Sequence, residues 1–224
     1  MKNRAYRPMT KWRVVLALML MGCAPALFAQ SAGTAGATSL SKAERDYLTQ
    51  YLRTTQKKFL DEIAGLSDAQ LKFKPTPFAW SIAEVAQHLA LAEDVIYNLV
   101  TQRVMKTPAQ PQLKRDNAPP IKDRAVIMFM TNRTAQRFQA PDPVRPTSAV
   151  KFSSHAETIH HFEKSRARNL AYLETTEDDL RSHFSESGLG WIDGYQWLIV
   201  LSAHSERHTE QIREVKAHRN FPAK

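Results

Sequence analysis

Two histidines stand four residues apart in the C-terminal segment WLIVLSAHSERHTEQIREV, residues 197–215. On an α-helix, residues with this spacing share one face, and their Cβ atoms are about 5–6 Å apart. His204 and His208 can therefore present two imidazoles to one metal ion, as histidines do in zinc sites. Two hydrogen-bonded core histidines would have the same spacing, so the pair alone does not decide between these hypotheses. The apolar residues on the same face are Trp197, Leu201, Ile212 and Val215.

A third histidine, His88, also has the periodicity of an inward-facing residue. It shares a helical stripe with Val85, Ala92, Val95 and Leu99. Two ligands from one helix and one from another make a three-histidine cluster with an open coordination position, which is typical of catalytic zinc sites. Burying three unpartnered imidazoles costs about 1–3 kcal/mol each, and a shared cation removes this cost.

These observations predict a divalent metal ion bound by His88, His204 and His208. Three imidazoles suit several metals, and we expect zinc or nickel, with iron or manganese as alternatives. Ser205 follows His204, so the chain has no HExxH metalloprotease motif, and no GxSxG motif supports a serine nucleophile. No catalytic residue is assigned.

Two polar residues lie one turn from the predicted ligands. Glu84 is a candidate general base, although capping of a helix is the preferred interpretation. Gln211 is either a hydrogen-bond partner of an imidazole or a polar residue at the end of the bundle. His155 is either an extra ligand or, as preferred, a residue at the rim of the site. We expect the remaining histidines to face solvent or to lie in loops: His160, His161, His183 and His218. Four aromatic residues either line a nearby pocket or, as preferred, belong to the core: Phe78, Trp191, Tyr195 and Trp197.

Capping-box spacings predict where four long helices begin. The pairs are Ser41 with Glu44, Ser81 with Glu84, Ser154 with Glu157, and Asp193 with Gln196. The expected helices end near Gly65, Met105, Thr176 and His218. A proline-rich crossover from Thr107 to Thr147 encloses one short amphipathic helix within residues 122–138. No segment alternates long enough to predict a strand. The expected fold is all-α, an antiparallel four-helix bundle with a long crossover containing a short extra helix.

The first 29 residues have the composition of a secretory signal peptide. A basic, acid-free start precedes an apolar run from Val14 to Phe28, which is shorter than the ~20 residues of a spanning helix. We expect cleavage after Ala29, a flexible linker over residues 30–40 and a bundle domain over residues 41–218, exported to the periplasm or secreted. Alternatively, LMGC resembles a lipobox and Cys23 anchors a lipoprotein.

Composition limits the classes of site and partner. Cys23 is the only cysteine, so a mature domain that lacks it has no disulfide, thiolate ligand or cysteine nucleophile. The formal net charge of +9 falls to about +4 without the five basic residues of the leader. We therefore expect a small-molecule substrate, no nucleic acid and no transmembrane span in the mature protein, and a homodimer is compatible with the sequence.

The segments LSDAQLKFKPTPFAWSIAEVAQHLALAE and GYQWLIVLSAHSERHTEQIREV resemble the DinB-like (DinB/YfiT-type) superfamily of proposed metalloenzymes. The resemblance covers about residues 40–216, and its order of WS..E...H and late H...H motifs is fairly specific. It implies a four-helix bundle that binds a divalent metal through His88, His204 and His208. It also implies an activity, either that of a thiol-dependent transferase or isomerase or that of a hydrolase. Export would separate this chain from a cytosolic thiol pool.

The resulting hypothesis is a metal-dependent hydrolase or transferase. Its metal would activate water or a substrate heteroatom. The alternative is a metal-binding or interaction module of the same fold without catalytic turnover.

Overall fold

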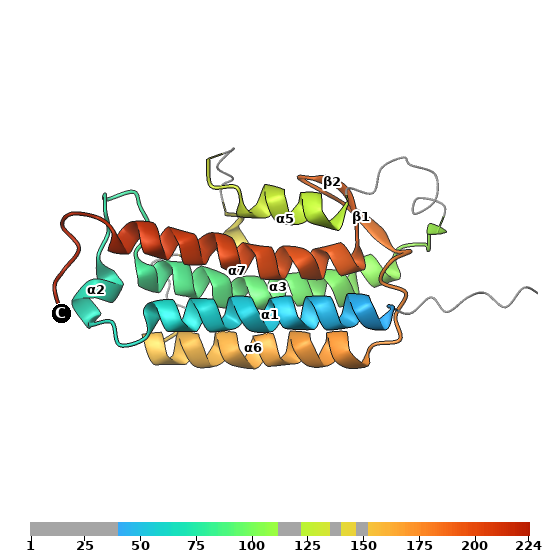
Figure 1. Ribbon diagram of the computed structural model, residues 1–224, viewed down its shortest axis with the longest axis horizontal. Coiled ribbons are helices and arrows are strands. Elements are labelled where there is room, and N and C mark those ends of the chain that lie inside the picture. Colours follow the sequence, from blue (N-terminus) through green and yellow to red (C-terminus); the bar gives the residue numbers. More distant parts are fainter. Residues whose placement is uncertain (1–39, 112–121, 135–139, 147–151) are drawn as a thin grey trace, which may run out of the picture. The chain divides into compact units, whose positions relative to one another are not determined.

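The computed structural model describes residues 40–111, 122–134, 140–146 and 152–224. Within these ranges, four long helices lie side by side (Figure 1): α1 (Lys42–Ile63), α3 (Ile82–Gln102), α6 (His155–Thr175) and α7 (Gly194–Lys216). The shorter elements are α2 (Asp68–Lys72), η1 (Val104–Lys106), α5 (Asp123–Thr131), η2 (Asp142–Val144), β1 (Phe184–Ser187) and β2 (Gly190–Asp193). The all-α bundle expected from the sequence is confirmed. The expected signal peptide, with Cys23, and the linker up to residue 39 lie outside the described residues.

Side-chain caps set the start of each long helix. The side chains of Ser41, Ser81 and Asp193 accept hydrogen bonds from the backbone N–H of the third helical residue. The side-chain oxygen of that third residue accepts a hydrogen bond from the backbone N–H of the cap residue. Ser154 caps α6 in the same way, but Glu157 accepts from the backbone of Ser153 instead. Each such cap stabilises its helix by about 1 kcal/mol. The caps fix the residue at which each helix begins, and packing of its apolar face against the other helices then orients its histidines.

The four long helices form two parallel pairs that run in opposite directions. The N-terminal halves of α1 and α7 and the C-terminal halves of α3 and α6 pack into one apolar cluster, which includes Leu48, Leu52, Val100, Leu173 and Leu198. The opposite halves form a second cluster, which includes Phe59, Leu89, Phe162, Ile212 and Val215. Helices α1 and α7 are therefore parallel neighbours, and α3 and α6 are another parallel pair running the opposite way. Parallel neighbours need a long connection, which explains the crossover between α3 and α6.

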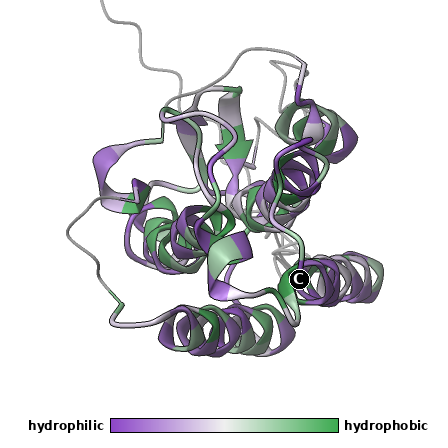
Figure 2. Cartoon of the chain, turned by 90° about the vertical axis from the view of Figure 1, so that its left-hand side faces the viewer, coloured by the Kyte–Doolittle hydropathy of each residue, from purple (hydrophilic) through white to green (hydrophobic). Residues whose placement is uncertain are grey.

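Helix α5 occupies the middle of that crossover and packs against the outside of α7. Viewed along the bundle (Figure 2), hydrophilic residues colour the outer faces of the long helices. The short helix expected within residues 122–138 is thus confirmed at Asp123–Thr131. Residues 135–139 of that prediction lie outside the described residues. In the described part of the chain, no helix has both the length and the apolarity needed to cross a membrane.

The strand pair β1–β2 and helix α2 were not expected from the sequence. Strands β1 and β2 form an antiparallel hairpin in which Phe184 pairs with Asp193 and Ser187 with Gly190. Each strand has four residues, too few to establish a two-residue period. Gly190 has a φ of 97°, which favours glycine and closes the turn. Helix α2 begins at another capping box, Ser67 with Gln70. The second strand of the hairpin ends at Asp193, which is the N-cap of α7.

One position on α3 was predicted wrongly. Val95 was placed on the inward stripe, but 37% of it is exposed. Helix α3 packs against both α6 and α7, so its buried sector is centred between two neighbours and includes Leu89, Glu93 and Ile96. His88 remains within this sector, because it lies on the side that faces α7.

Candidate metal centre

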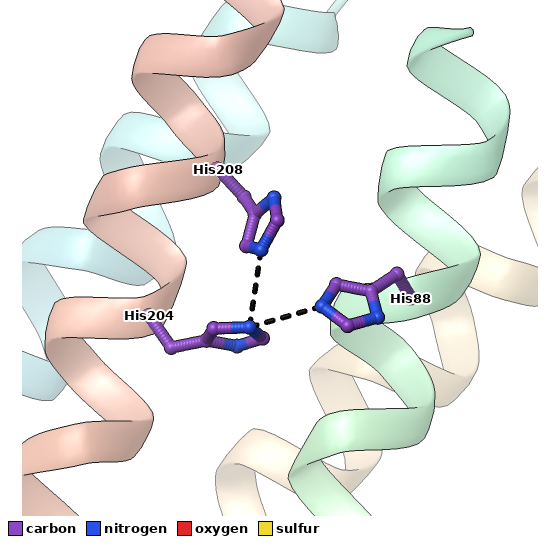
Figure 3. A group of neighbouring side chains, drawn as sticks. All are labelled: His88, His204 and His208. Carbon is purple, nitrogen blue, oxygen red and sulfur yellow. Dashed lines mark hydrogen bonds between the residues drawn. The ribbon is translucent and has the colours of Figure 1, made fainter. Parts of the chain in front are cut away.

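Three imidazole rings from two helices point at one another in the bundle interior (Figure 3). The Nε2 atom of His204 lies 2.9 Å from Nε2 of His88 and 3.1 Å from Nε2 of His208. Within the described ranges, these residues are the group whose ligand atoms all lie within 4.8 Å of one another. His88 comes from α3, and the other two come from adjacent turns of α7. The structure therefore brings together all three histidines that the sequence singled out.

The spacing of the three nitrogens fits a metal ion. Nitrogens bound to a tetrahedral ion at about 2.0–2.1 Å are about 3.3 Å apart. The observed separations of 2.9 and 3.1 Å are a few tenths of an ångström shorter. An outward shift of the rings by a few tenths of an ångström would bring these two separations to the tetrahedral value.

The tautomers of the rings also favour a cation. Nδ1 of His88 lies 2.7 Å from the carbonyl oxygen of Val144, and Nδ1 of His208 lies 2.8 Å from Oε1 of Gln211. Both oxygens are acceptors, so both Nδ1 atoms carry hydrogen and the neutral rings present Nε2 lone pairs. Nε2 of His204 can donate a hydrogen to only one of these lone pairs. A shared cation would satisfy all three nitrogens at once.

Burial keeps the three histidines neutral. It is the largest cause that lowers the pKa of His88, although the hydrogen bond to Val144 acts in the opposite direction. Burial and the charges of the other histidines hold the pKa of His204 well below its usual value, and His208 behaves in the same way through burial and His88. Metal ions bind the deprotonated form of imidazole. The three histidines are therefore in the neutral form that binds metal ions.

Comparison with known proteins identifies the family. A model of the DinB superfamily matches residues 51–212, which is more than half of the chain and contains all three histidines. The chain belongs to the DinB superfamily. The family membership expected from its motifs is therefore confirmed.

Two proteins of Bacillus subtilis are similar to this DinB-superfamily chain, one in sequence and one in its solved structure. The uncharacterized protein YuaE of strain 168 is 26% identical over 157 residues, which cover 70% of this chain and 89% of YuaE. The solved structure of YfiT is described as a probable metal-dependent hydrolase with an unusual four-helix bundle topology. It has a TM-score of 0.49 and 16% sequence identity, and the match covers 82% of this chain and 92% of YfiT.

The aromatic neighbour of the site in this DinB-superfamily protein is Trp80, which sequence analysis did not place there. Its ring centroid lies 5.0 Å from that of His88 and 6.3 Å from that of His208, nearly parallel to the latter. Phe78 and Trp191, by contrast, are 97% and 50% exposed. The prediction that both belong to the core is therefore wrong. The sequence did contain a signal for this position of Trp80, because Trp80 directly precedes Ser81, the N-cap of the helix that carries His88.

The two candidate polar partners take different roles. Both oxygens of Glu84 are engaged away from the histidines, one by the backbone of Ser81 at 2.7 Å and one by Nζ of Lys74 at 2.7 Å. The capping interpretation of Glu84 is therefore confirmed. Gln211 is a partner of a site imidazole, because its side-chain oxygen receives the hydrogen of His208 Nδ1. It holds that ring in the orientation that presents Nε2.

The other histidines stay outside the cluster. His155 is half-buried near the start of α6 and is not part of the three-histidine group in the described ranges. Three of the four histidines expected to face solvent or to lie in loops are half-buried with partners, and one of them, His218, accepts a hydrogen bond from the backbone of Asn220 at 3.2 Å. His161 Nε2 lies 2.7 Å from Asp94, and His183 Nδ1 donates to the carbonyl of Thr107 at 2.7 Å. Packing of α6 against α3 buries His161, which helical periodicity alone did not indicate.

The metal-free protein is expected to lose stability as the pH falls from 7 to 5. The unfolded chain binds protons at histidines with a pKa near 6.5, whereas the folded pKa values of the three site histidines are lowered. Below about pH 6.5 the unfolded state therefore binds more protons, and the free energy of unfolding falls by up to about 1.4 kcal/mol per pH unit for each histidine. Urea denaturation at pH 7, 6 and 5 measures this slope.

The matched control is His208→Gln, which removes one titrating ring and should make the slope shallower. Asp193 has the opposite effect, because burial raises its pKa to about 6 and its folded form takes up a proton in the same range. Since both proteins contain Asp193, its contribution cancels in the comparison. Equal slopes in the two proteins would contradict the expectation.

Proposed function

We propose that this protein binds a divalent metal ion through His88, His204 and His208. The single observation that supports this most strongly is the convergence of three Nε2 atoms, two of which present lone pairs because their Nδ1 atoms donate to oxygen. Three neutral imidazoles suit zinc or nickel, and iron or manganese are alternatives. Three protein ligands leave at least one coordination position for water or a substrate atom.

We further propose that the bound metal makes the protein a hydrolase or transferase acting on a small-molecule substrate. A divalent ion in such a site lowers the pKa of a bound water or substrate heteroatom towards neutrality. The protein's own contribution is to orient the rings: the carbonyl of Val144 holds His88, and the side chain of Gln211 holds His208. The ring of Trp80 lies against the rings of His88 and His208 and adds an apolar neighbour to the site.

A binding module without turnover is the second candidate. It is favoured by the absence of a carboxylate from the three-histidine group within the described ranges, since hydrolases commonly use one as a general base. Assays decide between the two. A metal-loaded protein that hydrolyses esters or amides, or that transfers a group to a thiol, is an enzyme, and one that is silent on all these substrates is a binding module.

Metal uptake is the first test. The protein is stripped with a chelator and titrated with zinc or nickel, and we expect one ion per chain. At a metal concentration of 100 times Kd, binding stabilises the fold by about 2.7 kcal/mol. In a protein of this length, this raises Tm by roughly 5–10 °C. A stoichiometry near zero together with an unchanged Tm would leave only a helical bundle with buried histidines.

We also propose that the chain is exported through its first 29 residues. The sequence alone supports this, through the basic start and the apolar run up to Phe28. Fractionation of the producing cells tests it, and a cytosolic product of full length would contradict it. Replacement of Cys23 by serine distinguishes the two routes, because only a lipoprotein loses its membrane association and its lipid label.

A further inference from the structure

A layer of buried polar residues separates the two apolar clusters of the bundle. Its centre is the ion pair between Arg166 of α6 and Glu93 of α3, whose side chains are 0% and 1% exposed. The guanidinium Nη2 lies 2.5 Å from Oε1 of Glu93, and Nε lies 3.1 Å from both carboxylate oxygens. Asn169 donates a further hydrogen bond to the same carboxylate at 2.9 Å. The pair is thus desolvated and well hydrogen-bonded.

Arg166 connects its own helix with the three other long helices. On α3 it holds Glu93. On α7 its Nη2 donates to Oγ of Ser205 at 2.7 Å. On α1 its Nη1 donates to the carbonyl of Leu52 at 2.8 Å and to Oγ1 of Thr55 at 3.2 Å. The planar guanidinium makes this possible, because its five N–H groups point in fixed directions.

Two of these links reach the helices that carry the candidate ligands. Glu93 is five residues after His88 on α3, and Ser205 directly follows His204 on α7. One guanidinium nitrogen, Nη2, contacts both Glu93 and Ser205. A single atom, Nη2 of Arg166, therefore links α3 to α7 close to the candidate metal site.

Stability by itself does not account for this pair. Buried ion pairs are often no more stabilising than apolar residues of similar volume, because desolvation offsets the attraction. Their best-supported role is to specify one arrangement of the elements they join. In this bundle, the arrangement that the pair specifies is the one in which nitrogens from α3 and α7 lie within 3.1 Å of His204 Nε2.

We infer that Arg166 is a positioning residue for the metal centre: by bridging Glu93 and Ser205 it holds α3 and α7 at the separation at which their histidines converge. This inference rests on the proposed metal binding. It differs from a purely structural role, because loss of the bridge weakens and distorts the metal site beyond its effect on folding.

The test compares two serines of α7. Ser205→Ala removes the hydroxyl that accepts from Arg166, and Ser202→Ala removes an equally buried hydroxyl that pairs with Thr55 at 3.0 Å. Ser205→Ala also loses the bond that this hydroxyl donates to the carbonyl of Leu201 at 3.2 Å, so its decrease in Tm should be somewhat larger than that of Ser202→Ala, and the metal readouts rather than Tm decide the test. The readouts are the Kd for zinc, measured by competition with a chelator, and the visible absorption spectrum of Co²⁺ bound to the full chain.

We expect Ser205→Ala to raise Kd about tenfold and to shift the Co²⁺ bands, while Ser202→Ala stays within about twofold of wild type. Arg166→Lys keeps a positive charge beside Glu93 but lacks the fork that reaches Ser205, and it should weaken metal binding at least as much. If wild type binds metal and both Ser205→Ala and Arg166→Lys bind it with unchanged Kd and spectrum, the positioning role is wrong. If wild type takes up no metal, the proposed function itself fails.

Discussion

The His204→Ala variant is expected to bind zinc or nickel at least about 100-fold more weakly than the wild-type protein. Nε2 of His204 lies 2.9 and 3.1 Å from the other two candidate ligands, so its removal takes away the donor that contacts both. Loss of an outer partner of a ligand already costs about 10–100-fold in metal affinity, and loss of the ligand should exceed this. Competition titration against a coloured chelator measures the change in Kd.

The matched control for this variant is His161→Ala. His161 is also a half-buried helical histidine, but its ring pairs with Asp94 and lies outside the three-histidine group. Its replacement should leave metal affinity and stoichiometry unchanged. Circular dichroism of both variants shows whether the bundle is intact. A folded His204→Ala protein with the wild-type Kd would exclude the proposed centre.

The Glu93→Ala variant is expected to lose about 3–5 kcal/mol of stability. It leaves the charge of Arg166 buried without its counter-ion, and removal of one partner of a buried pair has this order of effect. At roughly 2–4 °C per kcal/mol in a protein of this size, Tm should fall by about 6–20 °C. Denaturation with urea measures the change in the free energy of unfolding.

A surface pair provides the control for Glu93→Ala. Glu174 lies 2.9 Å from Arg53, and both side chains are largely exposed. Glu174→Ala should therefore change stability by no more than about 1 kcal/mol. The double replacement of Glu93 and Arg166 by leucine should recover part of the loss, because it removes both buried charges. A Glu93→Ala protein within 1 kcal/mol of wild type would show that water or a rearranged side chain compensates the arginine.

Local sequence signals determined where the long helices begin and which histidines face inward. Capping needs only residues three positions apart, and the structure has the expected side-chain caps at Ser41, Ser81, Ser154 and Asp193. A helical face needs only residues three or four apart, which is why the pair on α7 and His88 on α3 could be placed. The motifs around them also indicated the DinB superfamily, which the family match confirms.

Only the tertiary structure decided what meets across the bundle. Helical periodicity does not say which faces of different helices come together, and a charged residue on a helix is ordinarily expected at the surface. The burial of Arg166 with Glu93 could not be inferred for this reason, nor could the approach of Trp80 to two imidazoles. The convergence of the ring nitrogens within 3.1 Å of His204 Nε2 has the same origin, since it depends on the separation of α3 and α7. That separation is set by contacts between residues more than 30 positions apart in the chain, Arg166 with Ser205 among them.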